Sequence, residues 1–228
     1  MSDNGSQQPA RQFEREDMHG ARFSQVDLSE ARFERVGLER ARMDDASLAS
    51  AELHDVNLTD LVLTDANARG AKLSNVELSQ LILDDARLVH AKLSDVDVSN
   101  AHIEDANLSG STITNIDLSR LVLHDALLLD GRWSDVDASR TSLQNARWIG
   151  GTLRDCDFSR VKVDDCRGKH VHLHNVDLTD AVLSDVNLSG LRAKNVNLRG
   201  ALLEDCEIDG LTINGVRIDL LLENNRSG

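Results

Sequence analysis

Residues 176–190 read VDLTD-AVLSD-VNLSG, three blocks of five residues with an apolar residue at the first and third position of each block. The same register runs from Arg11 along the chain. The third position of nearly every block holds a large apolar residue, from Phe13 to Ile218. The exceptions at this position are small residues, namely Ala68, Ala138, Gly168 and Ala193. A repeat maintained over so much of the chain predicts one repetitive domain.

The spacing of the apolar positions indicates strands. Residues two apart face the same side of an extended chain, and the restart after five residues indicates a corner after each short strand. A helix with 3.6 residues per turn would spread this pattern around its whole surface. The pattern therefore excludes a long amphipathic helix and predicts an all-β solenoid with an aliphatic interior.

The repeat blocks resemble the A(D/N)LXX signature of the pentapeptide-repeat family, most clearly at residues 106–110, 176–180 and 186–190. The resemblance implies a right-handed quadrilateral β-helix with four blocks, or twenty residues, in each coil. Glycines at multiples of that period would share one edge: Gly70, Gly110, Gly150, Gly190 and Gly210. About ten coils at a strand spacing of ~4.8 Å give a rod roughly 50 Å long.

Three segments are expected: a disordered N-terminal tail at 1–10, the β-helix at 11–218, and a C-terminal cap and tail at 219–228. The end of the repeat is unusually apolar, and a solenoid end needs a cap. Resemblance to the fluoroquinolone-resistance members of the family suggests that this end also pairs two rods into a homodimer. The candidate cap and dimer residues are Ile218, Leu220, Leu221 and Leu222.

The charge of the chain favours basic partners. Its 228 residues carry a formal net charge of −14, with a pI near 4.9, which disfavours direct binding to nucleic acid or to an anionic membrane. Residues 1–16 contain no apolar signal-peptide core, and no apolar run is long enough to span a membrane. A cytoplasmic location is expected.

The rarer residue types are expected to fill the core. The three cysteines, Cys156, Cys166 and Cys206, form no CxxC motif, and their odd number and wide spacing indicate buried thiols with no disulfide or zinc framework. Trp133 and Trp148 fall within twenty residues of the small Ala138. Both tryptophans are therefore interpreted as core fillers.

No catalytic site is indicated, because a filled apolar interior without loop insertions offers no concave polar pocket. The chain is expected not to be an enzyme and to use no cofactor. His172 and His174 flank the inward Leu173, so both point outward and could bind a divalent cation. No third ligand follows at a defined spacing, so solvent-exposed histidines are the simpler interpretation.

Carboxylates gather along one edge of the expected rod and form the candidate acidic binding edge. Its residues are Asp95, Asp97, Asp117, Asp135, Asp137, Asp155, Asp157 and Asp177. Two explanations stay open: Asp and Asn accept hydrogen bonds from backbone NH groups at turns, whereas stacked carboxylates ~5 Å apart repel each other unless a basic partner screens them. A second aspartate ladder, from Asp45 to Asp205, is expected to be diluted by Arg87, Arg147 and Arg167.

Two functions follow for a non-enzymatic binding module. The fluoroquinolone-resistance members of the family resemble B-form DNA and bind DNA gyrase, which implies a DNA mimic that binds gyrase or topoisomerase. The charge of −14 falls short of the ~30 phosphates along 50 Å of duplex. The alternative is a protein–protein interaction scaffold with an outward apolar strip. The strip consists of Val62, Ile82, Val122, Val182 and Leu202.

Overall fold

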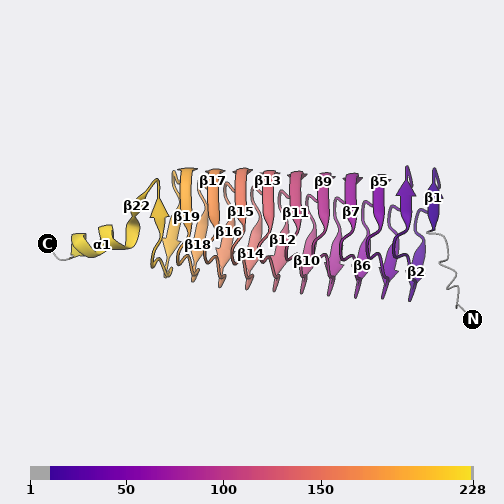
Figure 1. Cartoon of the computed structure of the whole chain (residues 1–228), viewed down its shortest axis with the longest axis horizontal. Helices are drawn as coiled ribbons and strands as arrows, with labels where there is room; N and C mark the ends of the chain where they lie inside the picture. Colours follow the sequence, from indigo (N-terminus) through magenta and orange to yellow (C-terminus); the bar gives the residue numbers. More distant parts are fainter. Residues whose placement is uncertain (1–10, 227–228) are drawn as a thin grey trace, which may run out of the picture.

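The computed structural model describes residues 11–226, which form a straight rod with a helix at its C-terminal end (Figure 1). Two parallel sheets run along the rod. The twelve-stranded sheet contains β1 (Gln12–Glu14), β3 (Arg32–Glu34), β5 (Glu52–Asn57), β7 (Lys72–Glu77), β9 (Lys92–Asp97), β11 (Thr112–Asp117), β13 (Arg132–Asp137), β15 (Thr152–Asp157), β17 (His172–Asp177), β19 (Arg192–Asn197), β21 (Thr212–Ile213) and β22 (Val216–Arg217). The ten-stranded sheet contains β2 (Arg22–Ser24), β4 (Arg42–Asp44), β6 (Val62–Thr64), β8 (Ile82–Asp84), β10 (His102–Glu104), β12 (Val122–His124), β14 (Ser142–Gln144), β16 (Lys162–Asp164), β18 (Val182–Ser184) and β20 (Leu202–Glu204).

Except for the terminal pair β21–β22, successive strands in each sheet pair in parallel with a register of twenty residues. Leu73 pairs with Leu93 in one sheet, and Ile103 pairs with Leu123 in the other. Equivalent positions therefore stack into ladders along the rod. The all-β solenoid of about ten coils that the repeat predicts is confirmed.

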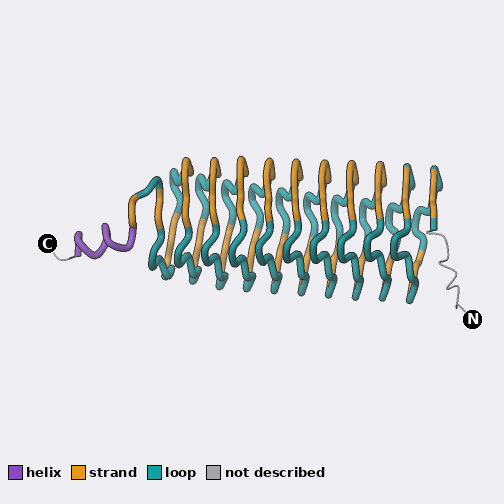
Figure 2. Tube along the Cα trace, viewed as in Figure 1, coloured by secondary structure: helices purple, strands orange, loops and turns teal. Residues whose placement is uncertain are grey.

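Each coil has four corners, one after every fifth residue. The corner residue has a positive φ, as at Asp95 (56°), Asp105 (49°) and Gly110 (68°). This left-handed conformation favours Gly, Asn and Asp, which explains why these residues end so many blocks. Strands alternate with loops along the whole tube (Figure 2), and the six-residue strands run through one corner, as β9 does at Asp95.

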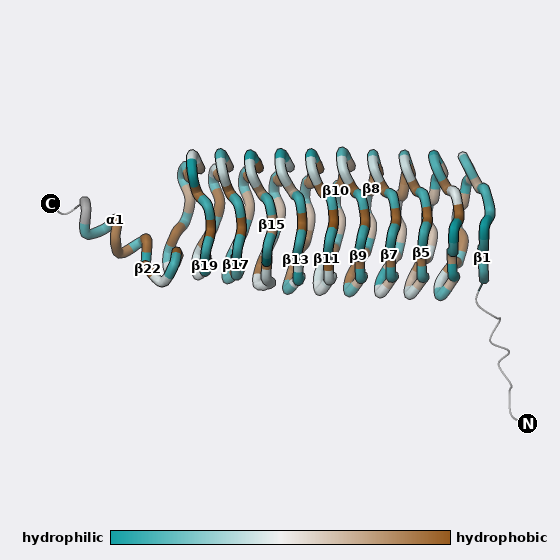
Figure 3. The backbone as a smooth tube through the Cα atoms, turned by 90° about the horizontal axis from the view of Figure 1, so that it is seen from above, coloured by the Kyte–Doolittle hydropathy of each residue, from teal (hydrophilic) through white to brown (hydrophobic). Residues whose placement is uncertain are grey.

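The first and third positions of the blocks face inward and are buried in the central coils, as the repeat predicts. Figure 3 shows the apolar residues alternating with hydrophilic ones along each strand. Trp133 and Trp148 pack together inside, with ring centroids 4.6 Å apart. Cys156 and Cys166 are buried free thiols, whereas Cys206, near the end of the solenoid, is only partly buried.

The parallel ladder ends at Ile213, although the sequence register continues to Ile218. Asn214 (φ 49°) and Gly215 (φ 84°) form a tight turn, after which β22 pairs antiparallel with β21. Two consecutive positive φ values at Asn-Gly are typical of a hairpin turn, so residues 214–218 leave the coil. Helix α1 (Ile218–Arg226) then projects away from the rod (Figure 1).

The tail predicted at residues 1–10 lies outside the described residues. Within residues 11–226, no helix is long and apolar enough to cross a membrane.

Candidate functional site

The candidate acidic edge is built from two neighbouring ladders. The first lies at the ends of strands β9 to β17 and stacks Asp97, Asp117, Asp137, Asp157 and Asp177 in direct register. In each case Oδ1 accepts a hydrogen bond from the backbone NH two residues later, at 2.7–2.9 Å. These carboxylates therefore form the local turn as well as the surface.

Asp177 has the most elaborate partners of this ladder. Its Oδ1 accepts a 2.5 Å hydrogen bond from the hydroxyl of Thr179 and a 2.7 Å bond from the Thr179 backbone NH. These bonds, the hydroxyl first, hold the pKa of Asp177 below its ordinary value despite partial desolvation. The carboxylate is ionised at neutral pH.

The second ladder occupies the preceding corner and mixes carboxylates with amides. Asn115 Nδ2 donates to Asp95 Oδ1 at 2.5 Å, and Asn175 Nδ2 donates to Asp155 Oδ1 at 2.6 Å. The amides relieve the repulsion that stacked aspartates would suffer. Asp135, which lies one coil before Asp155, is exposed. The structure thus brings all eight predicted acidic residues onto one edge.

The aspartate ladder on the opposite edge is the more strongly coupled. Its corner residues Asp85, Asp105 and Asp125 follow one another on successive coils with no amide between them. The pKa of Asp105 is raised, first by desolvation and then by the charges of Asp125 and Asp85. Arg87 and Arg167 follow Asp85 and Asp165 by two residues, and among residues 11–226 neither they nor Arg147 form an ion pair with a carboxylate. Their dilution of this ladder's field stays a prediction.

The histidine pair lies on the outer face of β17, with His172 exposed and His174 partly exposed. Within residues 11–226, no group of three or more His, Cys, Asp or Glu side chains lies close enough together to hold a metal ion. The pair has no third ligand in the part of the chain that the structure describes.

The outward apolar strip lies on the ten-stranded sheet and is interrupted. Val62 pairs with Ile82, and Val182 pairs with Leu202, so these form two short apolar patches. The ladder between the patches also carries the polar residues His102, Ser142 and Lys162. Val122 is therefore isolated among polar neighbours.

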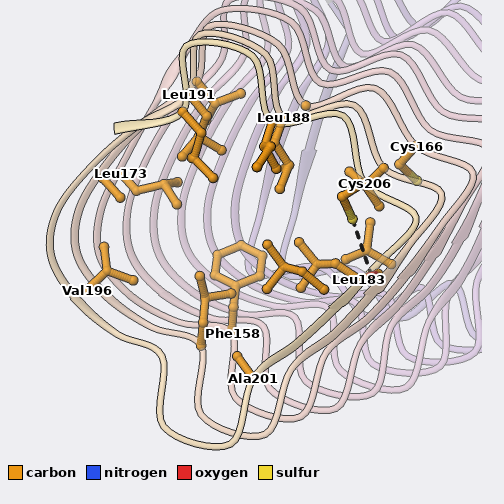
Figure 4. A pocket seen from close by; sticks show the side chains of 18 of the residues that line it. Phe158, Cys166, Leu173, Leu183, Leu188, Leu191, Val196, Ala201 and Cys206 are labelled. Atoms are coloured by element: carbon orange, nitrogen blue, oxygen red, sulfur yellow. Dashed lines mark hydrogen bonds between the residues drawn. The ribbon is translucent and has the colours of Figure 1, made fainter. Parts of the chain in front are cut away.

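The predicted cap residues divide into two groups. Ile218 packs against the core, whereas Leu220, Leu221 and Leu222 are 48%, 50% and 44% exposed. Leu203 is 41% exposed although it occupies an inward position. The later coils line a partly open apolar cavity of about 650 Å³, which extends from Leu143 to Leu222. Leu173, Leu183 and Cys206 are among the residues that line it (Figure 4). Ile218 and Leu222 of α1 also line this cavity.

The hollow follows from small residues inside the later coils. Gly168 and Ala193 replace the large residue at the third position of their blocks. In Figure 4 the Cys206 thiol, which donates to the Leu183 carbonyl at 3.4 Å, lies on the wall of the cavity. Large side chains fill the third positions in most earlier coils, whereas Gly168 and Ala193 leave part of the interior empty here.

The sequence matches the family model for pentapeptide repeats in eight copies, over residues 17–48, 27–60, 41–80, 62–100, 82–120 and 169–216. Together these segments cover more than half of the chain. The chain belongs to the pentapeptide-repeat family. A comparison with curated proteins finds no significant match.

Solved structures of other pentapeptide-repeat proteins resemble the rod. HetL, from the cyanobacterium Nostoc sp. strain PCC 7120 and involved in heterocyst differentiation regulation, is 22% identical with a TM-score of 0.56. The match covers 92% of this chain and 93% of HetL. QnrB1, a plasmid-mediated fluoroquinolone resistance protein, is 13% identical with a TM-score of 0.39, covering 92% of this chain and 98% of QnrB1. The likeness to HetL supports the fold.

Proposed function

We propose that this pentapeptide-repeat protein is a non-enzymatic binding module without a cofactor. Its acidic edge would dock into a basic groove of a protein partner in the cytoplasm. DNA gyrase or a related topoisomerase is the first partner to test, on the basis of the resemblance of the repeat blocks to the resistance proteins. The observation that carries the proposal is the register of Asp97, Asp117, Asp137, Asp157 and Asp177 on successive coils.

The ladder provides a regular row of negative charge. One oxygen of each carboxylate accepts the turn NH, as for Asp117 and Asp137, and both of these side chains are exposed. The ~4.8 Å rise along the rod per coil is longer than the 3.4 Å of helix axis per phosphate in one DNA strand. A basic groove that reads phosphates would therefore meet a weaker but equally regular charge row.

Neighbouring cations limit the width of this charge row. Arg120, Arg140 and Arg160 occupy the corner that follows the aspartate ladder, and all three are exposed. The acidic edge therefore resembles one phosphate strand and not the full surface of a duplex. This arrangement favours a narrow groove in the partner.

The test is a gyrase supercoiling assay at two salt concentrations. The variant carries Asp→Asn at Asp117, Asp137, Asp157 and Asp177, because an amide oxygen still accepts the turn NH while the charge is lost. The control carries Asp→Asn at Asp65, Asp85, Asp105 and Asp125 on the opposite edge. The wild type and the control are expected to alter supercoiling, and more strongly at low salt. The variant of Asp117, Asp137, Asp157 and Asp177 is expected to have no effect.

Two results would reject this assignment. No effect of the wild type at either salt concentration would reject gyrase as the partner. Equal effects of the wild type and the edge variant would show that these aspartates only form turns. Circular dichroism of each variant checks that it remains folded, so that a loss of effect can be assigned to the lost charges.

The exposed leucines of α1 support a second element of the proposal, a homodimer formed at the C-terminal end. Leu220 and Leu221 are half-exposed, and Ile218 and Leu222 of the same helix line the apolar cavity. Exposed apolar surface of this kind marks protein contacts. Sedimentation at micromolar concentration is expected to show a dimer, and Leu220→Ser with Leu221→Ser a monomer. A monomeric wild type would contradict the dimer without affecting the acidic edge.

The alternative function, an interaction scaffold with an unidentified partner, rests on the apolar patches of the ten-stranded sheet. Ile82 is 47% exposed and Leu202 is 46% exposed. Contact through these patches would change little with ionic strength, whereas contact through the acidic edge would weaken steeply. The salt series therefore separates the two functions, and Ile82→Ser tests the patch directly.

A further inference from the structure

The charges of the rod are separated onto two sides. The cationic side consists of the outward residues of segments 67–74, 87–94, 107–114, 127–134, 147–154, 167–174 and 187–194. These segments contain one carboxylate, Asp130. They contain eleven basic residues: Arg69, Lys72, Arg87, Lys92, Arg132, Arg147, Arg154, Arg167, Lys169, Arg192 and Lys194. A strongly acidic protein thus has one nearly pure cationic side.

These segments stack into one continuous surface. Bridges join residue 67 to 87, 87 to 107, and so on to 187, which aligns the first face of the cationic side. Strands β7 to β19 of the twelve-stranded sheet align the second face. The corner that holds His90, Gly110 and Asp130 connects the two faces. Seven coils therefore present the same side to solvent.

The cations of this side are available to a partner. Among residues 11–226, Lys72 is the only one of the eleven in an ion pair, with Glu52 at 2.7 Å. Arg87, Arg147 and Arg167 are exposed and stack on the bridges of the first face. Aspartate corners border this side, as at Asp85 beside Arg87 and Asp155 beside Arg154, but within the described residues these carboxylates form no ion pair with the two arginines. Carboxylates on the far faces of the rod are farther away than the ~8 Å screening length and offset the local field only weakly.

Apolar side chains lie in the middle of the cationic side. Leu127, Leu129 and Ile149 occupy outward positions and are partly exposed. Leu127 bridges to Arg147 on the next coil, and Leu129 and Ile149 hold the same position on successive coils. An apolar centre with arginines around it is typical of protein–protein interfaces.

We infer that the cationic side binds an acidic protein segment that also carries apolar side chains. Carboxylates would pair with the arginines, and the apolar side chains would cover Leu129 and Ile149. A nucleic acid fits less well, because the tryptophans and phenylalanines of the described chain point inward and present no large aromatic ring on this side for base stacking. This side ends where the acidic edge begins, since Arg154 directly precedes Asp155, so the rod would have two adjoining binding sides of opposite charge.

Fluorescence anisotropy with three probes tests the inference. The probes are a short peptide of alternating Glu and Leu, the same peptide with Ser in place of Leu, and a short DNA duplex. The variant carries Arg87→Glu, Arg147→Glu and Arg167→Glu. The matched control carries Arg120→Glu, Arg140→Glu and Arg160→Glu on the acidic side. A third variant, Leu129→Ser with Ile149→Ser, removes the apolar centre.

The Glu-Leu peptide is expected to bind about ten-fold more tightly than the Glu-Ser peptide. The arginine variant loses binding of both peptides, the matched control retains it, and Leu129→Ser with Ile149→Ser removes the difference between the peptides. Absence of peptide binding to the wild type, or equal losses in the two arginine variants, would overturn the inference. Tighter binding of the DNA duplex than of the Glu-Leu peptide would also overturn it, in favour of nucleic acid.

Discussion

The imidazole of His90 lies across the backbone of Gly110, one coil further along the rod. A Cβ atom at Gly110 would come within 2.3 Å of His90 Nδ1, and the φ of Gly110 is 68°. His170 lies over Gly190 in the same way, with a corresponding distance of 2.4 Å. Glycine at this corner therefore serves two needs, the left-handed backbone and room for the preceding side chain.

Gly110→Ala is expected to destabilise the rod more than Gly70→Ala. Both residues have nearly the same φ, but the nearest atom to a Cβ at Gly70 is Ser50 Oγ, at 3.6 Å. Gly70→Ala should cost about 1 kcal/mol for the left-handed backbone alone, and Gly110→Ala should cost more because His90 must move. Urea denaturation measures both free energies of unfolding.

His90→Ala provides the control for this prediction. In that background, Gly110→Ala should cost no more than Gly70→Ala, because the colliding ring is gone. If Gly110→Ala costs the same with and without His90, the ring does not restrict this corner.

Asp105→Asn is expected to raise the melting temperature at neutral pH. Desolvation and the charges of Asp125 and Asp85 raise the pKa of Asp105 in the folded state. The folded state therefore binds the proton more tightly than the unfolded chain, and its contribution to stability is complete below pH about 4 and lost as pH rises through the raised pKa. Asp105→Asn cannot ionise, so it should not lose this stability as the pH rises.

Thermal unfolding from pH 3 to 7 checks the prediction about Asp105. Asp180→Asn is the matched control. Asp180 lies on a different corner of the coil, where its neighbours on the adjacent coils are Arg160 and Gly200 and not carboxylates. The control should not be stabilised at pH 7. A melting temperature of Asp105→Asn equal to that of the wild type at every pH would contradict coupling between the stacked carboxylates.

Insertion of one residue between Ser119 and Arg120 should disrupt the rod, whereas Ser119→Ala should be nearly neutral. The register of twenty residues places Leu118 inside and Ser119 outside, and a one-residue shift exchanges the two faces of a strand. Circular dichroism and melting temperature measure the effect. Comparable stability of the two variants would mean that ladder register does not maintain the fold.

Cys206 should react with a thiol reagent before Cys156. Burial raises the pKa of Cys156 to about 11, and only the thiolate is nucleophilic. The pKa of Cys206 is also raised, but its side chain is partly exposed at the open end of the solenoid. At pH 8, single-cysteine variants should differ by about ten-fold or more in labelling rate. Equal rates would indicate that the rod opens along its length.

The fold was predictable because each five-residue block contains both the inward residues and the corner residue that define its conformation. An inward residue such as Leu118 and a corner residue such as Arg120 recur every five positions, so register can be assigned without distant information. The parallel ladder ends at Ile213 although Ile218 still falls in the sequence register, because Asn214 and Gly215 form a turn. That dipeptide was the available hairpin signal, and the strength of the repeat obscured it.

The acidic edge was only partly predictable. The sequence identified the stacked aspartates, but it could not separate the turn-forming Asp117 from the corner residue Asp95, whose partner is the Asn115 amide. The coupling at Asp105 depends on which corner side chains lie side by side, and spacing alone does not show that. The net charge of −14 concealed the cationic side, because a sum over the chain carries no information about direction.

The twenty-residue register has a consequence for how this molecule can change in size. Removing residues 101–120 would delete one complete turn and join Asn100 to Leu121, which occupy the same corner and the following inward position as Arg120 and Leu121 do now. Every remaining ladder would stay continuous, since each coil touches only its neighbours. Whole coils can therefore be added or lost, and only the distances between surface features on opposite sides of the change would shift, by one coil spacing for each coil.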